Sequence, residues 1–282
     1  MQERELSIEG IRLHYVEWND ATQSASRNVL LIHGLTGSNR EWTGLGDHLS
    51  REGFRVLAPD LRGRGLSSKP AHGYGIQYHV ADLLTLLDSL GLDSVSVVGH
   101  SLGGAIGLYM TAVFPARVRK LVVVDIGIRV PADTLQAIAA SLNRLGQVYP
   151  SMDAYLEMCR RMPYFKWSDF WEAYFRYDAE VRPDGTVVSK VSKSGIQEEI
   201  ASNAAINTEL FPPMLRAPTL ILRATEGLLA PDRGLLLPRE EADRLQALIA
   251  GSQVKEFPNT NHYTIITSPE FGPAVSDFLK KD

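Results

Sequence analysis

Hydrophobic positions follow two patterns along the chain. The segment from Leu6 to Tyr15 alternates apolar and polar residues on either side of Gly10, which is typical of an antiparallel hairpin at the edge of a sheet. Continuous apolar runs, typical of strands buried on both faces of a parallel sheet, lie at 29–32, 56–58, 95–98 and 121–124. Helical patterns separate these runs at 42–49, 80–90 and 102–114. The alternation predicts an α/β fold with right-handed crossovers.

The pattern changes between residues 131 and 212. This segment contains no convincing buried strand, is mainly helical in pattern and is rich in aromatic residues, with a turn predicted at Pro183-Asp184-Gly185. The sheet pattern then resumes with a strand at 218–222, a helix at 239–249, a strand at 254–257 and a helix at 269–279. We interpret 131–212 as a helical cap inserted into one catalytic domain, 1–130 and 213–282. The alternative is an insertion that touches no ligand.

Composition narrows the class of protein. With 282 residues, 44% of them hydrophobic, the chain can bury a large core. A net charge of −4 without a long block of one sign argues against nucleic acid as a partner. The charged N-terminus lacks an apolar signal core, and no apolar run approaches the roughly 20 residues that cross a bilayer. We therefore expect no membrane insertion and a cytoplasmic monomer or homodimer.

The single cysteine, Cys159, cannot form an internal disulfide. It has no glycine turn around it, so we expect a thiol that packs in a helix rather than a nucleophile.

A candidate nucleophile stands in Gly99-His100-Ser101-Leu102-Gly103, between a predicted strand and a predicted helix. This is the G-x-S-x-G pattern in the structural context that it requires. Bulky residues at Gly99 and Gly103 would clash with a tight turn, and the turn would lift the Ser101 hydroxyl to a helix N-terminus, which favours negative charge. The alternative is an ordinary glycine-rich turn.

A serine nucleophile needs two N–H donors for the oxyanion that forms during attack. The G-x-S-x-G geometry assigns one to Leu102, which follows the serine. The other comes from the loop after His33-Gly34, where Leu35 is the best candidate. We expect His33 to order this loop rather than to act as a base.

These motifs resemble the α/β-hydrolase superfamily, and within it the serine-nucleophile, carboxylesterase-like branch. The resemblance rests on His33-Gly34, Asp60 to Ser67, Gly99 to Gly103 and Asn261-His262, and it covers nearly the whole chain outside the cap. It implies an eight-stranded, mostly parallel sheet flanked by helices. It also implies the order serine, acid, histidine. Arg62 and Arg64 are expected to support their loop rather than to bind an anion.

His262 lies where the family places its base, between the last predicted strand and the last helix. Neutral imidazole can take the proton from Ser101 near neutral pH, because its reference pKa is about 6.5. The other histidines have no comparable placement; they include His14, His48, His72, His79 and His100.

Two positions, each at the end of a predicted strand, are candidates for the acid of the triad. The position most common in the family falls on Gly227, with Glu226 one residue early. Asp125 directly follows the apolar run 121–124, and a carboxylate there is costly to bury unless it is paired. We favour Asp125 over Glu226, with Asp232 a weaker alternative. Without a catalytic role, Asp125 would bond to backbone near the cap hinge.

The reaction follows from these residues. A serine nucleophile argues against the dehalogenase and epoxide-hydrolase branches of the family, which use aspartate. No metal-ligand cluster and no phosphate-binding glycine motif with its lysine is visible, so we expect no cofactor. Trp167, Trp171 and Tyr174 have the spacing of one helix face, which either binds an apolar substrate or packs the cap.

The sequence therefore predicts a carboxylesterase that cleaves a small or medium apolar ester through an acyl-enzyme, with Trp167 and Trp171 binding the substrate. The alternatives are a lactone, amide or carbon–carbon hydrolase with the same triad and, from a different class, a ligand receptor that retains the pocket without turnover.

Overall fold

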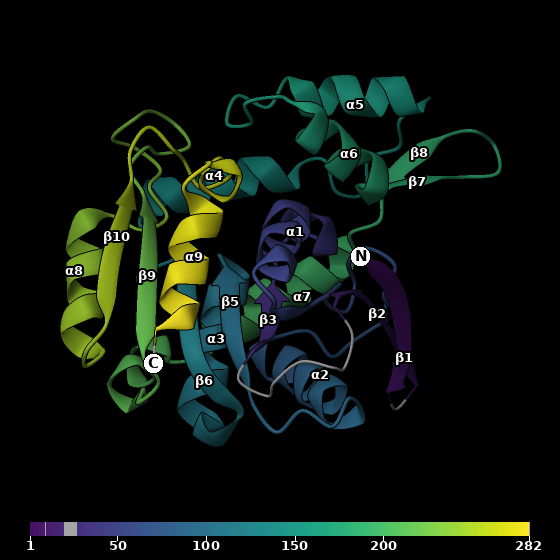
Figure 1. Cartoon of the computed structure of the whole chain (residues 1–282). Helices are drawn as coiled ribbons and strands as arrows, with labels where there is room; N and C mark the ends of the chain where they lie inside the picture. The colour runs from purple at the N-terminus through teal and green to yellow at the C-terminus, as the bar shows by residue number, and fades with distance from the viewer. Residues whose placement is uncertain (9, 20–26, 282) are drawn as a thin grey trace.

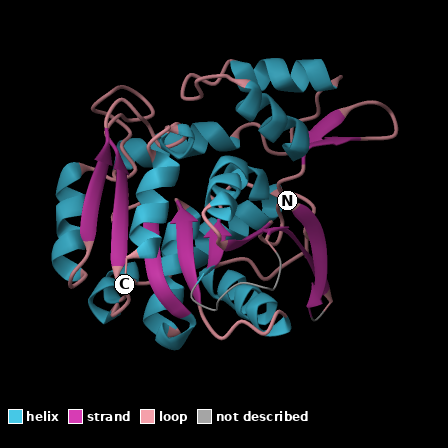
Figure 2. Cartoon of the chain, in the orientation of Figure 1, coloured by secondary structure: helices cyan, strands magenta, loops and turns pink. Residues whose placement is uncertain are grey.

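The computed structural model describes residues 1–8, 10–19 and 27–281, and within them it builds an eight-stranded sheet in the order β1-β2-β4-β3-β5-β6-β9-β10 (Figures 1 and 2). The strands are β1 (Gln2–Ile8), β2 (Ile11–Trp18), β3 (Asn28–Ile32), β4 (Arg55–Pro59), β5 (Val95–His100), β6 (Val118–Val124), β9 (Thr219–Ala224) and β10 (Gln253–Phe257). Strand β2 is antiparallel to β1 and β4, and the other pairings are parallel. The predicted α/β fold with a mostly parallel sheet is confirmed.

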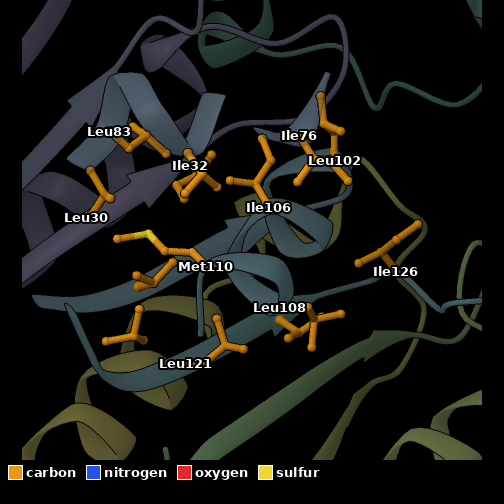
Figure 3. Packing of buried hydrophobic residues seen from close by; sticks show 14 of the residues in the cluster. Leu30, Ile32, Ile76, Leu83, Leu102, Ile106, Leu108, Met110, Leu121 and Ile126 are labelled. Carbon is orange, nitrogen blue, oxygen red and sulfur yellow. The ribbon is translucent and has the colours of Figure 1, made fainter. Parts of the chain in front are cut away.

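Helices cover both faces of this sheet, which is why its central strands contain continuous apolar runs. One face carries α1 (Thr43–Arg51) and α9 (Phe271–Lys280), and the other carries α2 (Ile76–Ser89), α3 (Leu102–Val113) and α8 (Arg239–Leu248). Along β3, Leu30 and Ile32 pack with α2 and α3, whereas Val29 and Leu31 pack with α1 and α9. Figure 3 shows buried residues on the face that α2 and α3 cover, with Ile106 of α3 beside Ile32.

Several element boundaries differ slightly from the predicted ones. The predicted hairpin is present as β1 and β2, and Gly10 between them has a φ of +88°, which suits glycine. The helix predicted at 42–49 begins with a 3₁₀ turn, η2 (Asn39–Trp42), before α1. Helix α2 begins at Ile76 rather than at residue 80, directly after Gly75.

The inserted segment contains α4 (Ala132–Leu142), α5 (Met152–Arg160), α6 (Asp169–Asp178) and α7 (Lys193–Ala204). Figure 1 shows α4, α5 and α6 together at the carboxyl end of the central strands. The expectation that this segment has no buried strand is wrong: β7 (Ala179–Val181) and β8 (Val187–Ser189) form a hairpin around the predicted turn, and Val187 is fully buried. Strands of three residues are too short to produce a detectable alternation. The cap boundaries at 131 and 212 stay a prediction.

Buried polar contacts tie the inserted segment to the loop after β4. The hydroxyl of Tyr177 in α6 donates to Asp60 Oδ2 at 2.6 Å. Glu199 of α7 pairs with Arg64 and lies 2.7 Å from His79 Nε2. Arg62 of the same loop donates to Asp82 and to a backbone carbonyl. Both loop arginines are thus engaged by protein groups, as expected.

Four further short 3₁₀ turns complete the described chain: η3 (Pro115–Arg117), η4 (Thr208–Leu210), η5 (Pro212–Met214) and η6 (Ile265–Thr267). Within the described ranges, no helix combines the length and the apolar character that crossing a membrane requires.

The closest backbone packing in the core depends on glycine at the start of α3. A Cβ on Gly103 would lie 1.9 Å from the carbonyl oxygen of Ile32, and one on Gly99 would lie 2.1 Å from the carbonyl oxygen of Gly103. These neighbours are backbone atoms, so a flexible side chain cannot move aside to relieve the clash.

We expect Gly103→Ala to lower the free energy of unfolding by about 2 kcal/mol or more, because the strand and helix must separate to admit the methyl group. Gly44→Ala in α1 is the matched control, since nothing lies within 4 Å of its added Cβ and alanine favours a helix. Urea unfolding of both variants measures the difference. Equal stability of the two would contradict this account of the packing.

Candidate active site

Ser101 lies on a sharp turn between β5 and α3. Its backbone has φ 54° and ψ −120°, in a region that residues other than glycine rarely adopt. Its N–H donates to the carbonyl of Val124 at 3.0 Å, which fixes the turn against β6. The side chain is partly exposed and lines a cavity above the sheet. A strained backbone at a cavity-facing hydroxyl is typical of a functional site.

Asp125 immediately follows β6 and is 2% exposed. Its N–H donates to the carbonyl of Leu222, and its Oδ1 accepts the N–H of Ala224 at 2.9 Å. Its other oxygen, Oδ2, lies 2.9 Å from Nδ1 of His262. One carboxylate oxygen is therefore held by the neighbouring strand, and the other is presented to the imidazole, which satisfies the requirement that a buried carboxylate be paired.

The alternative acids lie elsewhere. Among the described residues, Asp125 is the carboxylate within ion-pair distance of His262. Glu226 is half-buried, and its N–H donates to the carbonyl of Thr260 at 2.8 Å. Asp232 is exposed. The geometry thus joins His262 to Asp125 rather than to Glu226 or Asp232.

His262 is 5% exposed, in the loop that follows β10. Burial lowers the pKa of His262 and the neighbouring His100 lowers it further, while hydrogen bonding to Asp125 acts in the opposite direction. The net effect is a pKa below the usual range, so the imidazole is neutral at neutral pH. That is the state in which a histidine can accept a proton.

The loop that carries His262 is shaped by the residue before it. The side-chain oxygen of Asn261 accepts the N–H groups of Tyr263 and Thr264, both at 3.0 Å, as in an Asx turn. The Asn261 amide donates to the carbonyl of Tyr164 in the segment before α6. Asn261 therefore fixes the loop that follows it and joins this loop to the segment before α6. These contacts hold the imidazole of His262 in place.

The loop after β3 is held rigidly beside Ser101. The N–H of Leu61 donates to Nε2 of His33 at 3.0 Å, so the proton of His33 is on Nδ1, which lies 2.8 Å from the carbonyl of Gly34. Burial lowers the pKa of His33 and keeps it neutral. The Nε of Arg64 donates to the carbonyl of Leu35 at 3.0 Å. His33 orders this loop, as predicted.

The two predicted oxyanion donors flank the serine. Leu35 lines the same cavity as Ser101 and His262. Leu102 is the first residue of α3, and an N–H in the first turn of a helix has no acceptor within that helix. The N–H of Leu102 is therefore available to an anion above Ser101, and Leu35 stays the predicted second donor.

Sequence reasoning missed two residues of the site. His100 directly precedes Ser101 in the chain, and its ring centroid lies 4.4 Å from that of His262. Glu41 of η2 lies beside it, with Oε1 2.6 Å from Nδ1 of His100. The only sequence signal for His100 is its place inside the G-x-S-x-G motif, and nothing in the pattern around Glu41 distinguishes it from an exposed helical glutamate.

The cavity above Ser101 holds about 770 Å³ of space that protein atoms leave empty, including its open mouth. Its floor comes from the ends of β3 and β5, and its roof from α4, the α5–α6 segment and α6. Apolar and aromatic side chains dominate the walls: Leu35, Ile138, Leu142, Met162, Tyr164, Phe165, Trp171, Tyr174, Phe175, Leu228, Tyr263 and Ile266. Arg144 adds a buried charge, 4.0 Å from Asp178.

The structure separates the two tryptophans that were predicted to bind the substrate. Trp171 is 2% exposed and lines the cavity. Trp167 does not share its helix face, because α6 begins at Asp169, and Trp167 is not part of the cavity wall. Its ring stacks on Phe175 at 5.8 Å and carries the guanidinium of Arg160 on it at 5.2 Å. Trp167 therefore packs against other residues of the inserted segment.

In the part of the chain that the structure describes, neither Cys159 nor a cluster of metal ligands offers a second reactive centre. Cys159 is buried in α5, where burial raises the pKa of its thiol to about 12. Across the described ranges, His, Cys, Asp and Glu side chains form no group of three that could hold a metal ion.

Known proteins share this architecture. The family profile for the alpha/beta hydrolase fold matches residues 27–269. The chain is similar to the 2-hydroxy-6-oxo-2,4-heptadienoate hydrolase of Pseudomonas putida, with 32% identity, covering 94% of this chain and 93% of that protein. It is also similar to a 2-hydroxymuconate semialdehyde hydrolase of Pseudomonas putida, with 30% identity, covering 89% and 86%.

A solved structure of E-2-(acetamidomethylene)succinate hydrolase superposes with a TM-score of 0.86 over 99% of both chains, at 23% identity, which is a likeness of fold. The family profile spans most of the chain, and the observed sheet has the architecture that the motifs imply. The chain belongs to the α/β-hydrolase family.

Proposed function

We propose that this protein is a serine hydrolase that cleaves a carboxylic ester of a small or medium apolar substrate through an acyl-enzyme. The observation that carries the proposal is the contact between Asp125 and Nδ1 of His262, at 2.9 Å, because His262 lines the same cavity as the strained Ser101. The family and the names of its relatives support hydrolase activity.

In the proposed mechanism, Asp125 accepts the Nδ1–H of His262, which leaves Nε2 free to take the Ser101 proton. The Ser101 oxygen attacks the carbonyl carbon, and the N–H groups of Leu35 and Leu102 hold the resulting oxyanion. His262 then returns the proton to the leaving alcohol, which departs as the acyl-enzyme forms. His262 then takes a proton from water, whose oxygen attacks the acyl carbon. His262 returns that proton to the Ser101 oxygen as the ester bond to the serine breaks, which releases the carboxylic acid and regenerates Ser101.

The cavity supports an apolar substrate. Trp171, Tyr174 and Phe165 present their rings on its roof, and Trp171 contacts Tyr174 edge to face at 5.4 Å. Aromatic rings bury large apolar areas and are rigid, so they favour a ligand of matching shape. The substrate would lie between this roof and Ser101.

Carbon–carbon hydrolysis is a second candidate, favoured by a specific observation. The two curated relatives named above are a 2-hydroxy-6-oxo-2,4-heptadienoate hydrolase and a 2-hydroxymuconate semialdehyde hydrolase. The same serine, histidine and aspartate could serve that chemistry, because it also passes a proton and places negative charge on an oxygen. A receptor without turnover is disfavoured by the complete set of acid, base and nucleophile.

We expect turnover of p-nitrophenyl esters of short and medium chain length, and we expect Ser101→Ala to abolish it, because the attacking oxygen is lost. Release of p-nitrophenol from a chain-length series measures both. Ser194→Ala, an exposed serine at the start of α7, is the matched control and should turn over normally.

A dienoic ketone assayed beside these esters distinguishes the candidate functions. A dienoic ketone cleaved far faster than every ester would select carbon–carbon hydrolysis. Binding without turnover of any compound would select the receptor. Ester turnover that survives Ser101→Ala would refute the mechanism.

We expect Asp125→Asn to reduce kcat by roughly 10³- to 10⁴-fold, because the amide cannot hold the required tautomer of His262 or stabilise its cation. Glu226→Gln is the control and should leave kcat within about threefold of the native value. Steady-state kinetics on one ester measures both. Near-normal turnover in Asp125→Asn, together with a large loss in Glu226→Gln, would show that Glu226 rather than Asp125 is the acid of the triad.

Turnover should fall on acidification, because protonated His262 cannot accept the Ser101 proton. Since the pKa of His262 is lowered, activity is retained below the usual histidine range of about 6.5 and is lost only as pH falls through the lowered value. The pH dependence of kcat/KM from about pH 4 to about pH 8 measures this. A flat profile over that range would exclude His262 as the base.

A further inference from the structure

A second pair of buried ionisable groups lies beneath the candidate nucleophile. Glu41 is 7% exposed and His100 is 2% exposed, and Oε1 of Glu41 lies 2.6 Å from Nδ1 of His100. The mechanism proposed above uses neither of them. Burying an acid and a base is costly, so their contacts need an explanation.

The hydrogen bonds of His100 indicate its charge. Its Nε2 lies 3.0 Å from the carbonyl oxygen of His262, which can only accept, so Nε2 carries a proton. Its Nδ1 faces the Glu41 carboxylate. The second oxygen of Glu41 accepts the N–H of Gly34 at 3.3 Å, as expected for an ionised carboxylate. The arrangement fits an imidazolium with a proton on each nitrogen, paired with a carboxylate.

The electrostatics agree with this assignment. Burial alone would lower the pKa of His100, but the charge and hydrogen bond of Glu41 outweigh it, and the pKa of His100 is raised above its usual range. His33, equally buried, is the contrast: its Nε2 accepts the N–H of Leu61, and its pKa is lowered.

The pair connects two parts of the site that are distant in sequence. Through Gly34 it contacts the start of the loop that holds Leu35, and through the carbonyl of His262 it contacts the base itself. The rings of His100 and His262 also lie against each other, with centroids 4.4 Å apart. One buried pair thus touches both the oxyanion loop and the backbone of the base.

We propose that Glu41 and His100 form a permanently charged positioning pair that sets the place of the oxyanion loop and of the base, and that holds the base in its neutral form. This role rests on the proposed function, since it assigns His262 as the base. Neither residue exchanges a proton with the substrate.

Burial is the first cause that keeps the base neutral, and the neighbouring cation adds to it. A second positive charge beside the imidazolium of His100 is unfavourable, so protonation of His262 is opposed. The groups that face His262 from other elements are Asp125 after β6 and Glu41 in η2, and both favour its protonated form, though less than burial and His100 oppose it. On the roof, Tyr174 of α6 faces Glu41 and is kept protonated by burial, which raises its pKa.

The test is the pH dependence of kcat/KM for His100→Gln, which removes the cation but keeps an amide donor. We expect the acid limb to move up by about one pH unit, because His262 becomes easier to protonate. Glu41→Gln should move the limb in the same direction by less, since it makes His100 neutral but also removes a negative charge. His72→Gln, whose side chain is 90% exposed, is the control and should match the native profile.

A purely structural role for the pair would lower kcat at every pH without moving the limb, and that result would overturn the proposal. The proposed function fails separately, through ester turnover that survives Ser101→Ala, whatever the profile of His100→Gln. Thermal unfolding of each variant establishes that it is folded.

A second measurement uses the native protein and does not depend on activity or on the folding of a variant. Nitrogen-15 NMR of the histidine side chains at neutral pH should show both ring nitrogens of His100 protonated, with His33 as a singly protonated reference. A singly protonated His100 at neutral pH would overturn the proposal, even for a fully active enzyme.

Discussion

The site depends on the absence of side chains where α3 begins. Gly103 lies so close to the end of β3 that a single added carbon would come within 1.9 Å of the Ile32 carbonyl. This approach brings the first turn of α3 beside the loop that begins at Gly34. As a result, the hydroxyl of Ser101 and the N–H of Leu102, which are neighbours in the chain, lie beside the loop of Leu35 from a distant segment. The strained angles of Ser101 follow from the same turn and are maintained by the packing around it.

The parts of this structure that follow local rules could be predicted. Continuous apolar runs such as 121–124 became central strands because both faces of the sheet are covered, and the glycines around Ser101 identify the turn. The order of motifs placed His262 after β10. The choice of Asp125 over Glu226 rested on the cost of an unpaired buried carboxylate, and the structure supplies the partner in His262.

The remainder depends on contacts between distant segments. Glu41 is next to a helix start in the sequence, but only the fold brings it to His100, whose neighbour in the chain is the nucleophile. Trp167 has the spacing of a helix face with Trp171, yet the helix begins after it, at an N-cap serine, Ser168, that spacing alone does not take into account. The hairpin of β7 and β8 is evident from its backbone pairing and from the bridge between Val187 and Tyr149. Its strands are too short for the sequence to show them.

Through Arg64, the inserted segment also supports the loop that contains Leu35. Its guanidinium is fully buried and joins the carbonyl of Leu35 to the carboxylate of Glu199 in α7. Removing one partner of such a pair leaves an uncompensated buried charge, at a cost of about 3 to 5 kcal/mol. A chimera that takes this segment from a relative lacking an acid at position 199 would therefore disturb the peptide beside Ser101, even if every residue of the original domain were retained. Through this arginine the inserted segment and the loop of Leu35 are coupled, so a change in one is transmitted to the other.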